Sequence, residues 1–400
     1  MNILVTDGDN RSALAVTRSL GRLGHTVLVT DTKGKTLASC SRFCSRSIAT
    51  PDPLQHAAAY AGAIMEIADR EKIDTIFPMT EQSIYALNRF RGSLPATTLL
   101  ACPPPSMMES VSDKSALCKM AESLQVAIPK TLYLDNAGDL ARIIDQIDTF
   151  PVVVKPALSR IQVGEGFLSG GVCYASDRYA LEKLYASRPV LKYPSLIQEK
   201  IVGSGTGLFT LYGENRHLAL FSHKRLREKP PSGGVSVVSQ SVVLDQEMVA
   251  ASDRLLSAVG WSGVAMVEFK RDRRDGKAKL MEINGRFWGS LQLAITCGVD
   301  FPALLLGALH GTSSTALVDD YPAGHKLKWF LGTLDHLIIR LKNNKTTLNL
   351  TQTAPSKCRA VADFLRIWEK DTSFDVISKN DIAPFRYEIS SYLKNLRRRS

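Results

Sequence analysis

The chain has 400 residues, of which 44% are hydrophobic and 22% charged, and its formal net charge is +11 at pH 7. The length predicts roughly two to four domains rather than one core. The composition excludes a membrane-spanning or disulfide-rich protein, because no apolar run approaches the length of a span and the seven cysteines are scattered without a second close pair for zinc. We expect reduced thiols and a cytoplasmic location, and the polar N-terminus is not expected to act as a signal peptide.

Residues 1–108 alternate between short apolar runs and helical patterns. Strands are predicted over 2–6, 25–30, 73–78 and 99–102, and helices over 12–24, 54–70 and 81–91. This alternation predicts a parallel sheet of Rossmann type, which ends at the stiff stretch Pro103 to Pro105. The first turn, Asp7 to Asn10, contains one glycine and lacks the G-x-G-x-x-G fingerprint. No dinucleotide site is therefore expected there.

Two further units are predicted over residues 109–312. In the first, 109–197, helices are expected over 113–124 and 177–186 and strands over 151–155, 172–174 and 195–198. Ser112 or Asp113 is a suitable cap for its first helix. In the second, 198–312, strands are expected over 207–212, 217–223 and 235–240, then a helix over 246–258, a hairpin, and helices over 289–297 and 302–310. The expected fold class is thus a multidomain mixture of α/β and α+β.

Two glutamates stand inside apolar runs that indicate the neighbouring strands of this hairpin. Glu268 lies in Met-Val-Glu-Phe, and Glu282 begins the pattern Glu-x-Asn-x-Arg that continues to Asn284 and Arg286. Alternation along a strand places Glu282 and Asn284 on one face, and strand pairing would bring Glu268 beside them. Oxygen ligands that converge in this way suit Mg²⁺, and Arg286 would neutralise a phosphoryl group. The alternative is a hairpin whose acidic side chains point into solvent.

Lysines and glycines earlier in the chain indicate a phosphate site. Lys155 ends the apolar strand Val-Val-Val-Lys, where a buried ammonium group is costly unless it meets an anion. A nearby loop offers backbone N–H groups without side-chain obstruction, although glycines also mark plain hairpins. Its glycines are Gly164, Gly166, Gly170 and Gly171. Lys114 opens a helix whose dipole favours anions, with a solvated lysine as the alternative.

In this order, the motifs resemble those of the ATP-grasp superfamily. They are an α/β N-terminal domain, Asp113-Lys114, Val-Val-Val-Lys155-Pro, a glycine loop, Gln198-Glu199-x-Ile201-x-Gly203, and Glu268 with Glu282-x-Asn284-x-Arg286. The similarity covers residues 1–310 and is closest to the branch that includes the carbamoyl phosphate synthetase large chain and biotin carboxylase. It implies a Rossmann-like pre-ATP-grasp domain over 1–108 and a two-lobed ATP-grasp fold, with a small lobe and lid over 109–197 and a large lobe over 198–312.

The resemblance also implies which residues bind ATP and magnesium. The phosphates would be contacted by Lys114, Lys155, Gly170 and Gly171. Adenine would be held, largely through backbone groups, by the hinge residues Gln198, Glu199 and Ile201. The family's Mg²⁺ ligands, which Mn²⁺ would also suit, match Glu268, Glu282 and Asn284, and its phosphate-facing arginine matches Arg286. The family often has an acidic residue after the hinge glycine to hold the ribose, whereas residues 204–207 contain none.

An ATP-grasp site of this kind activates a carboxylate as an acylphosphate, which an amine then attacks. The implied activity is that of an ATP-dependent carboxylate–amine ligase, with a small-molecule carboxylate and amine as partners. Arg225 is our candidate for binding the carboxylate. The turn with Gly233, Gly234 and Ser236 offers N–H groups for a carboxylate or acylphosphate. Glu81, after a predicted parallel strand, is placed to touch the second substrate, although an ordinary helix N-terminus explains it equally well.

Residues 313–400 are predicted to form a basic C-terminal extension. Lys and Arg outnumber Asp and Glu there, and the chain closes with Lys394 and Arg397 to Arg399. The helix predicted over 328–341 has apolar residues at helical spacing among basic ones, so it would rest on a membrane surface or, as we favour, pack against the rest of the protein. No nucleic-acid partner is expected, because the basic tail lacks interleaved aromatic residues. A homodimer is left open.

Two other functions stay open from the sequence. The first is a regulatory nucleotide-binding module without turnover, which would bind ATP and release no phosphate. The complete set of lysines and metal ligands argues against it. The second is an ATP-dependent carboxylase that acts through carboxyphosphate. It would show ATP hydrolysis stimulated by bicarbonate.

Overall fold

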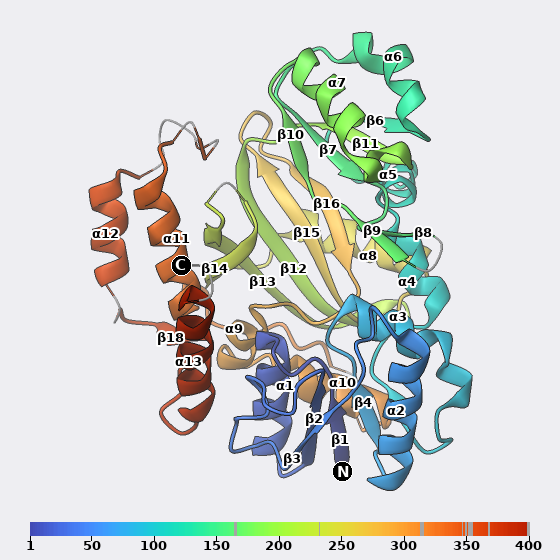
Figure 1. Ribbon diagram of the computed structural model, residues 1–400, viewed down its shortest axis with the longest axis vertical. Coiled ribbons are helices and arrows are strands. Elements are labelled where there is room, and N and C mark those ends of the chain that lie inside the picture. The colour runs from blue at the N-terminus through green and yellow to red at the C-terminus, as the bar shows by residue number, and fades with distance from the viewer. Residues whose placement is uncertain are drawn as a thin grey trace.

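The part of the chain that the structure describes forms three β-sheets with their covering helices and a separate two-stranded hairpin (Figure 1). The computed structural model describes residues 1–163, 166–231, 233–312, 316–345, 347–348, 350, 355–366 and 369–397. In Figure 1 the N-terminal sheet lies at the bottom, the largest sheet in the centre and the small sheet at the top, with the last helices of the chain on one side.

The N-terminal sheet is parallel throughout, with the strand order β3-β2-β1-β4-β5. Its strands are β1 (Asn2–Val5), β2 (Thr26–Asp31), β3 (Arg46–Ala49), β4 (Thr75–Phe77) and β5 (Leu99–Leu100). Side chains of β1 alternate between two buried clusters: Ile3 packs with α1 (Arg11–Arg22), whereas Leu4 packs with α2 (Ala57–Arg70) and α3 (Glu81–Arg89). Every strand and helix predicted here is present, and β3 is a strand that the sequence analysis missed.

Two helices lead from this sheet into the small sheet. Pro105 begins α4 (Pro105–Ser112) instead of only breaking the chain, since proline is tolerated in the first turn of a helix. Helix α5 (Lys114–Ser123) is capped as predicted by Asp113, whose carboxylate accepts hydrogen bonds from the backbone N–H groups of Ser115 and Ala116.

The small sheet is antiparallel, with the order β10-β7-β11-β6. Its strands are β6 (Thr131–Leu134), β7 (Val152–Pro156), β10 (Cys173–Ala175) and β11 (Ser195–Glu199). Helices α6 (Leu140–Ile143) and α7 (Arg178–Ser187) pack on one face through a buried apolar cluster. The hairpin of β8 (Arg160–Val163) and β9 (Gly166–Ser169) follows β7.

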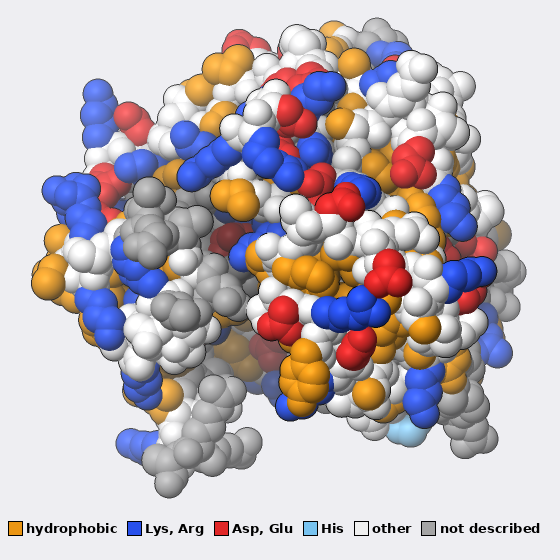
Figure 2. Space-filling view, turned by 90° about the horizontal axis from the view of Figure 1, so that it is seen from above, with side chains coloured by type: hydrophobic (Ala, Val, Ile, Leu, Met, Phe, Trp, Pro, Cys, Tyr) orange, Lys and Arg blue, Asp and Glu red, His pale blue; other side chains and the backbone are white. Residues whose placement is uncertain are grey.

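Seen from above, basic and acidic side chains are intermixed on the visible face rather than gathered in one basic surface (Figure 2).

The largest sheet has seven strands in the order β16-β15-β12-β13-β14-β17-β18. They are β12 (Gly203–Gly213), β13 (Arg216–Lys229), β14 (Val235–Ser241), β15 (Gly263–Asp272), β16 (Ala278–Asn284), β17 (Lys326–Lys328) and β18 (Thr372–Phe374). Leu208 and Val267 pack with α8 (Gln246–Ala258) on one face, and Phe209 and Met266 with α9 (Leu291–Thr296) and α10 (Phe301–Leu309) on the other. The second cluster also contains Ile3 and Leu14, so one core joins this sheet to the N-terminal one.

The segment predicted as a basic extension adds β17 and β18 to this sheet. Its helices are α11 (Phe330–Lys342), α12 (Lys357–Leu365) and α13 (Ala383–Arg397), and Figure 1 shows them beside the central sheet. The helix predicted over 328–341 is α11, which lies against β13 and β14. Arg398 and Arg399 of the predicted basic tail lie outside the described residues. Within the described ranges, no helix is both long and apolar enough to cross a membrane.

Short 3₁₀ turns complete the secondary structure. They are η1 (Arg91–Ser93), η2 (Ala137–Asp139), η3 (Ile144–Gln146) and η4 (Pro189–Lys192). None of these four turns lines either of the two larger cavities described below. Residues of η4 line a separate small cavity.

Candidate active site

Two adjoining cavities hold most of the predicted site residues. The first, here the inter-sheet cavity, has a volume of about 580 Å³ and is lined from β7, β11, β13, β15 and β16. The second, here the α1–α13 cavity, has a volume of about 1120 Å³ and is lined from the N-terminal ends of α1 and α3 and from α13. Both are lined by Arg11, Val235, Arg286 and Gly289. A molecule in one cavity can therefore meet a molecule in the other.

The hairpin of β15 and β16 brings the predicted metal ligands together in the inter-sheet cavity. The strand register places Glu268 directly opposite Glu282, and Met266 opposite Asn284. The side-chain amide of Asn284 donates a hydrogen bond of 2.8 Å to Glu282. Arg286 in turn donates to the amide oxygen of Asn284, at 3.2 Å. The acidic side chains line the cavity instead of pointing into solvent, which was the alternative.

The two glutamates experience opposite electrostatic surroundings. Burial raises the pKa of Glu268, and the neighbouring charge of Glu282 adds to the rise while Arg225 opposes it. Burial also acts to raise the pKa of Glu282, but the Asn284 hydrogen bond and the charges of Lys114, Lys155 and Arg286 outweigh it and leave the pKa lowered. Two carboxylates that face each other at low dielectric favour a shared cation.

The donor set fits a hard divalent cation such as Mg²⁺. It consists of two carboxylates and one amide oxygen, and all three side chains line one cavity. Across the residues that are described, no group of three or more His, Cys, Asp and Glu side chains is placed to hold a metal ion. Asn284 is therefore needed to complete the candidate set.

Both predicted phosphate lysines reach the same cavity. Lys155 projects from β7, and burial lowers its pKa while the carboxylate of Glu282 opposes that change. Lys114 is the first residue of α5, and its Nζ donates a hydrogen bond of 2.9 Å to the hydroxyl of Ser159. A cavity with two lysines, Arg286 and two carboxylates suits a metal-bound polyphosphate.

The predicted hinge residues line the rim of the inter-sheet cavity, but their polar side chains have protein partners. Gln198 is buried, and its amide donates to the hydroxyl of Thr131 at 3.0 Å. The carboxylate of Glu199 accepts from Arg274 at 2.7 Å and from Lys279 at 3.1 Å. These contacts leave backbone groups, rather than side chains, for recognition of a bound base, as the resemblance implies.

Arg225 differs from its prediction in one respect. Its guanidinium lines the inter-sheet cavity, yet it forms ion pairs with Glu268 and with Glu228, the latter at 3.1 Å. A substrate carboxylate would have to compete with two protein carboxylates for this arginine. The pairing was not visible in the sequence, because it depends on the alignment of β13 with β12 and β15.

The predicted turn after β13 lines the same cavity through Gly233, Gly234 and Ser236. Gly233 has a φ of +129°, a conformation that side chains rarely adopt. A Cβ on Gly234 would collide with the carbonyl oxygen of Lys229. Ser236 exchanges a hydrogen bond of 2.7 Å with Ser239. The glycines are thus required by the turn itself. The N–H of Gly233 donates a hydrogen bond of 3.1 Å to the carbonyl of Pro230, so binding of a carboxylate or acylphosphate by this turn stays a prediction.

Three predicted residues lie outside the inter-sheet cavity. Gly170 and Gly171 line a separate small cavity of about 120 Å³, and a Cβ on Gly170 would collide with Pro156 and Val190. Gly170 thus serves the packing of β7 against η4. Contact of these glycines with the ATP phosphates stays a prediction. Gly164 of the same loop lies outside the described residues. Glu81 lines the α1–α13 cavity, where a second substrate was expected.

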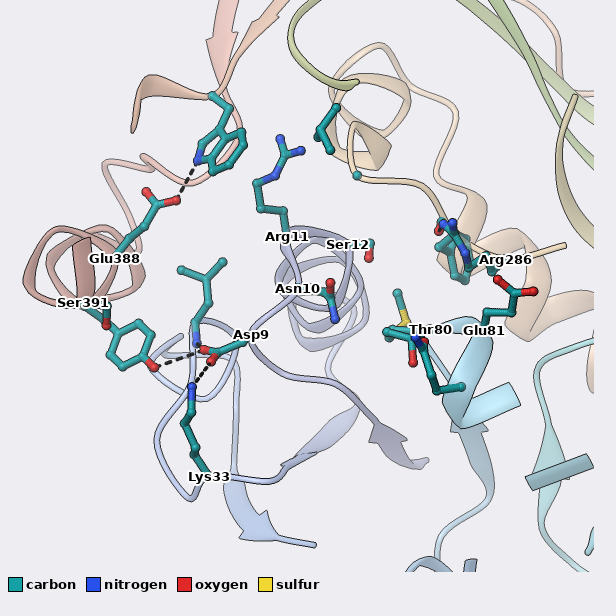
Figure 3. Close-up of a pocket in the computed structure, with 18 of the residues that line it drawn as sticks. Asp9, Asn10, Arg11, Ser12, Lys33, Thr80, Glu81, Arg286, Glu388 and Ser391 are labelled. Atoms are coloured by element: carbon teal, nitrogen blue, oxygen red, sulfur yellow. Dashed lines mark hydrogen bonds and ion pairs between the residues drawn. The ribbon is translucent and has the colours of Figure 1, made fainter. Parts of the chain in front are cut away.

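The α1–α13 cavity also contains residues that the sequence analysis missed (Figure 3). Figure 3 shows Arg11 between Glu388 on one side and Arg286 on the other, with Thr80 and Glu81 across the space. Arg11 follows the turn after β1, at the carboxyl edge of a parallel sheet, which is a signal that could have identified it. Glu388 belongs to α13, and nothing in the sequence brings that helix to this edge.

Comparisons with known proteins agree with this fold. A family model described as ATP-grasp in the biosynthetic pathway with Ter operon matches residues 221–330. No curated protein matches the chain. Biotin carboxylase from Campylobacter jejuni has 16% identity and a TM-score of 0.63, with 78% of this chain and 72% of that chain covered.

Two further solved structures are similar over comparable lengths. N5-carboxyaminoimidazole synthetase from Staphylococcus aureus has 14% identity and a TM-score of 0.61, covering 79% of this chain and 78% of that one. L-amino acid ligase from Bacillus licheniformis has 19% identity and a TM-score of 0.57, covering 77% and 73%. The chain has the ATP-grasp fold, and its resemblance to the ATP-grasp superfamily, including the biotin carboxylase branch, is confirmed.

Proposed function

We propose that this protein is a Mg·ATP-dependent ligase that joins a carboxylate to an amine. The observation that carries the proposal is the pairing of Glu268 with Glu282 across β15 and β16, beside Asn284 and facing Lys114 and Lys155 in one cavity. The fold adds support, because the ATP-grasp enzymes that are similar to this chain are ATP-dependent ligases.

The chain's own residues would divide the work as follows. Lys114, Lys155 and Arg286 would bind the phosphates of ATP, and the backbone of 198–201 would hold adenine. Glu268, Glu282 and Asn284 would hold Mg²⁺, or Mn²⁺ in its place. When bound, the ion would neutralise phosphate charge and orient the γ-phosphoryl group. The ribose has no assigned residue, because residues 204–207 carry no acid.

The proposed reaction has two steps. A carboxylate oxygen of the substrate attacks the γ-phosphorus of ATP, the bond to the bridging oxygen breaks, and ADP leaves. The amine nitrogen then attacks the acyl carbon, phosphate departs, and the nitrogen loses its proton. The protein must hold two anions together in the first step, and the cations at the junction of the two cavities lower the repulsion between them.

The proposal includes the domain division inferred from the sequence. A Rossmann-like pre-ATP-grasp domain would span 1–108, the small lobe and lid 109–197 and the large lobe 198–312. The basic segment 313–400, predicted as an extension, adds β17 and β18 to the sheet of the large lobe. A cytoplasmic location and a homodimer stay predictions. Membrane contact through the extension is not proposed, because α11 packs against β13 and β14.

An ATP-dependent carboxylase is the second candidate, since biotin carboxylase is among the similar structures. Bicarbonate that stimulates ADP release without any organic carboxylate would favour it over the ligase.

A screen for ADP release over pairs of carboxylates and amines with Mg²⁺ tests the proposal. Glu282→Gln keeps the shape of the side chain but removes the charge, so we expect it to lower ADP release at least about a hundredfold. Glu109→Gln, on the exposed side of α4, is the matched control and should be active. Tight ATP binding without phosphate release for every pair would instead identify a nucleotide-binding module, and an active Glu282→Gln would contradict the metal assignment.

A further inference from the structure

Arg11 occupies the junction of the two cavities. It is the first residue of α1, and its side chain lines both the inter-sheet cavity and the α1–α13 cavity. Only 11% of the side chain is exposed. Figure 3 shows its side chain extending away from the end of α1 into the space between Glu388 and Arg286.

Two contacts fix the position of this guanidinium, and a glycine leaves room for it. Nη1 forms an ion pair with Asp375, a carboxylate whose side chain is 1% exposed. The guanidinium carbon lies 4.1 Å from the ring centre of Trp329. A Cβ on Gly289 would lie only 2.9 Å from Nη2, so the glycine leaves the room that Arg11 occupies. An arginine held in this way is preorganised, because little side-chain entropy is lost when a ligand binds it.

Part of the guanidinium remains free to bind a ligand. Among the described residues, Nε and Nη2 of Arg11 have no hydrogen-bond partner; only Nη1 is used, by Asp375. The situation of Arg225 is the opposite, since two protein carboxylates already pair with it. A planar edge with free N–H groups suits the paired oxygens of a carboxylate or phosphate.

The charge of the α1–α13 cavity also favours an anion. Four of its basic residues, Lys35, Arg160, Arg286 and Lys394, form no ion pair within the part of the chain that is described. Among its acidic residues, Asp9 is paired with Lys33 at 3.1 Å. Glu81 and Glu388 are the remaining acids. Positive charge therefore exceeds negative charge in this cavity.

We propose that Arg11 binds an oxyanion group, a carboxylate or a phosphate, of the non-nucleotide substrate that occupies the α1–α13 cavity. This inference rests on the proposed function, and it assigns to Arg11 the carboxylate-binding part that the sequence analysis gave to Arg225. The C-terminal segment positions the arginine through Asp375 and Trp329, so two distant parts of the chain build one substrate contact.

Steady-state kinetics with a substrate pair found by the ADP-release screen tests this role. Arg11→Gln should raise the KM of the anionic substrate about tenfold or more, because one charge-assisted contact is lost, and should leave the KM of ATP within about twofold. For Arg11→Lys, the KM of the anionic substrate should lie between those of the wild type and Arg11→Gln. Arg22→Gln, at the exposed far end of the same helix, should match the wild type. An unchanged KM for the anionic substrate in Arg11→Gln would overturn the proposal.

Gly289→Ala provides a test that does not remove the charge. The added methyl group meets the end of a flexible side chain, so the protein should fold normally while the guanidinium moves. We expect the KM of the anionic substrate to rise severalfold with no change in melting temperature. This variant also answers the objection that Arg11→Gln acts by leaving Asp375 buried without a partner. An unchanged KM in Gly289→Ala would count against the assigned position of Arg11.

Calorimetric titration without ATP separates failure of this inference from failure of the proposed function. Succinate is compared with succinamide, and glycerol 3-phosphate with glycerol, to decide between carboxylate and phosphate. The inference is supported if one anion binds to the wild type and to Arg22→Gln but not to Arg11→Gln. This result supports it even where no substrate pair releases ADP. Absence of binding by both anions, or equal binding to Arg11→Gln, overturns it.

Discussion

Glu388 is a buried carboxyl group in the wall of the α1–α13 cavity. One of its oxygens accepts a hydrogen bond of 2.7 Å from Trp329 Nε1. The other, Oε2, is buried with no hydrogen-bond partner in the described part of the chain. Burial raises the pKa of Glu388 to about 7; Asp375 adds to the rise, and Trp329, Arg11 and Lys229 oppose it. The group is therefore partly protonated near neutral pH.

This pKa gives stability a defined dependence on pH. The folded state keeps the proton of Glu388 up to about pH 7, whereas the unfolded chain loses it near the ordinary value of 4.5. The folded state then binds more protons than the unfolded one, so the free energy of unfolding falls as pH rises through this window, by on the order of 3 kcal/mol. We expect Glu388→Gln to remove this loss, because glutamine keeps an acceptor for Trp329 without the charge.

Urea unfolding at about pH 4.5 and about pH 8 checks the expectation. Glu388→Gln should be more stable than the wild type at the higher pH, and the gain should largely disappear at the lower pH. Glu109→Gln, an exposed change of the same type on α4, should stay within about 0.5 kcal/mol of the wild type at both. A gain of equal size at the two pH values would show that ionisation of Glu388 is not its cause.

At the scale of single residues, the sequence predicted those site positions that follow from the alternation of side chains along one strand and its neighbour. Glu268, Glu282 and Asn284 could be placed together because two strands joined by a short connection must pair. The ion pair of Arg225 with Glu268 could not be predicted, because the two residues lie on β13 and β15 and meet across β12, the strand between them. Arg11 was missed for a similar reason, since Asp375 and Trp329 are distant in sequence.

At the scale of elements, α1 is tied to the C-terminal segment by a buried arginine. Arg18 is 2% exposed, and its guanidinium donates to the Asp381 carboxylate at 2.8 Å and to the carbonyl of Val376 at 2.9 Å. Asp381 also accepts a hydrogen bond of 2.7 Å from Ser41. This cluster fixes the chain just before α13, and so fixes one wall of the α1–α13 cavity.

We expect Asp381→Ala to lower the free energy of unfolding by about 3–5 kcal/mol, because it leaves the charge of Arg18 buried without its partner. Denaturant unfolding measures this change. Asp320→Ala removes an exposed carboxylate from the same segment and should cost less than about 0.5 kcal/mol. Equal stability of the two variants would mean that the Arg18 cluster contributes nothing to docking of the C-terminal segment.

Gly203 sets the approach of β12 to β15 next to the hinge. A Cβ at this position would collide with the carbonyl oxygen of Arg271, which is backbone and cannot move alone. Gly203→Ala should therefore cost about 2–3 kcal/mol or more by forcing the strands apart. Gly213→Ala, at the other end of β12, would place its Cβ 3.5 Å from Leu218 and should be tolerated. Thermal unfolding that ranks the two variants in the opposite order would contradict this steric account.

Elements with their own strong pattern were predictable, and short ones were not. The helix predicted over 246–258 is α8 with the same bounds, because its apolar spacing and its Asp245 cap lie within the segment. Strand β17 has three residues, two of them lysines, and exists because β14 offers it a partner. Strand β3 is likewise a short edge strand, recognised only by its pairing with β2.

At the scale of the whole molecule, the C-terminal segment completes structures that begin much earlier in the chain. Leu327 and Val376 belong to the same buried cluster as Ile3 and Phe209. β17 pairs with β14 through Val238 and Lys328, so the central sheet continues into residues that follow 312. A sequence reading that assigns residues by local pattern cannot see this, because each piece of the segment gains its partner only in the folded protein.

Removal of residues 313–400 should therefore prevent stable folding rather than release an independent extension. The truncated chain would leave Arg18 buried without Asp381, at a cost of about 3–5 kcal/mol, and would expose the apolar side of the shared core as well. Together these losses approach the whole stability of a typical domain, about 5–15 kcal/mol. Size-exclusion chromatography and circular dichroism of the chain 1–312 beside the full chain test this. A monomeric truncated chain that unfolds cooperatively, with the wild-type melting temperature, would show that the segment is dispensable for the fold and that it serves the α1–α13 cavity alone.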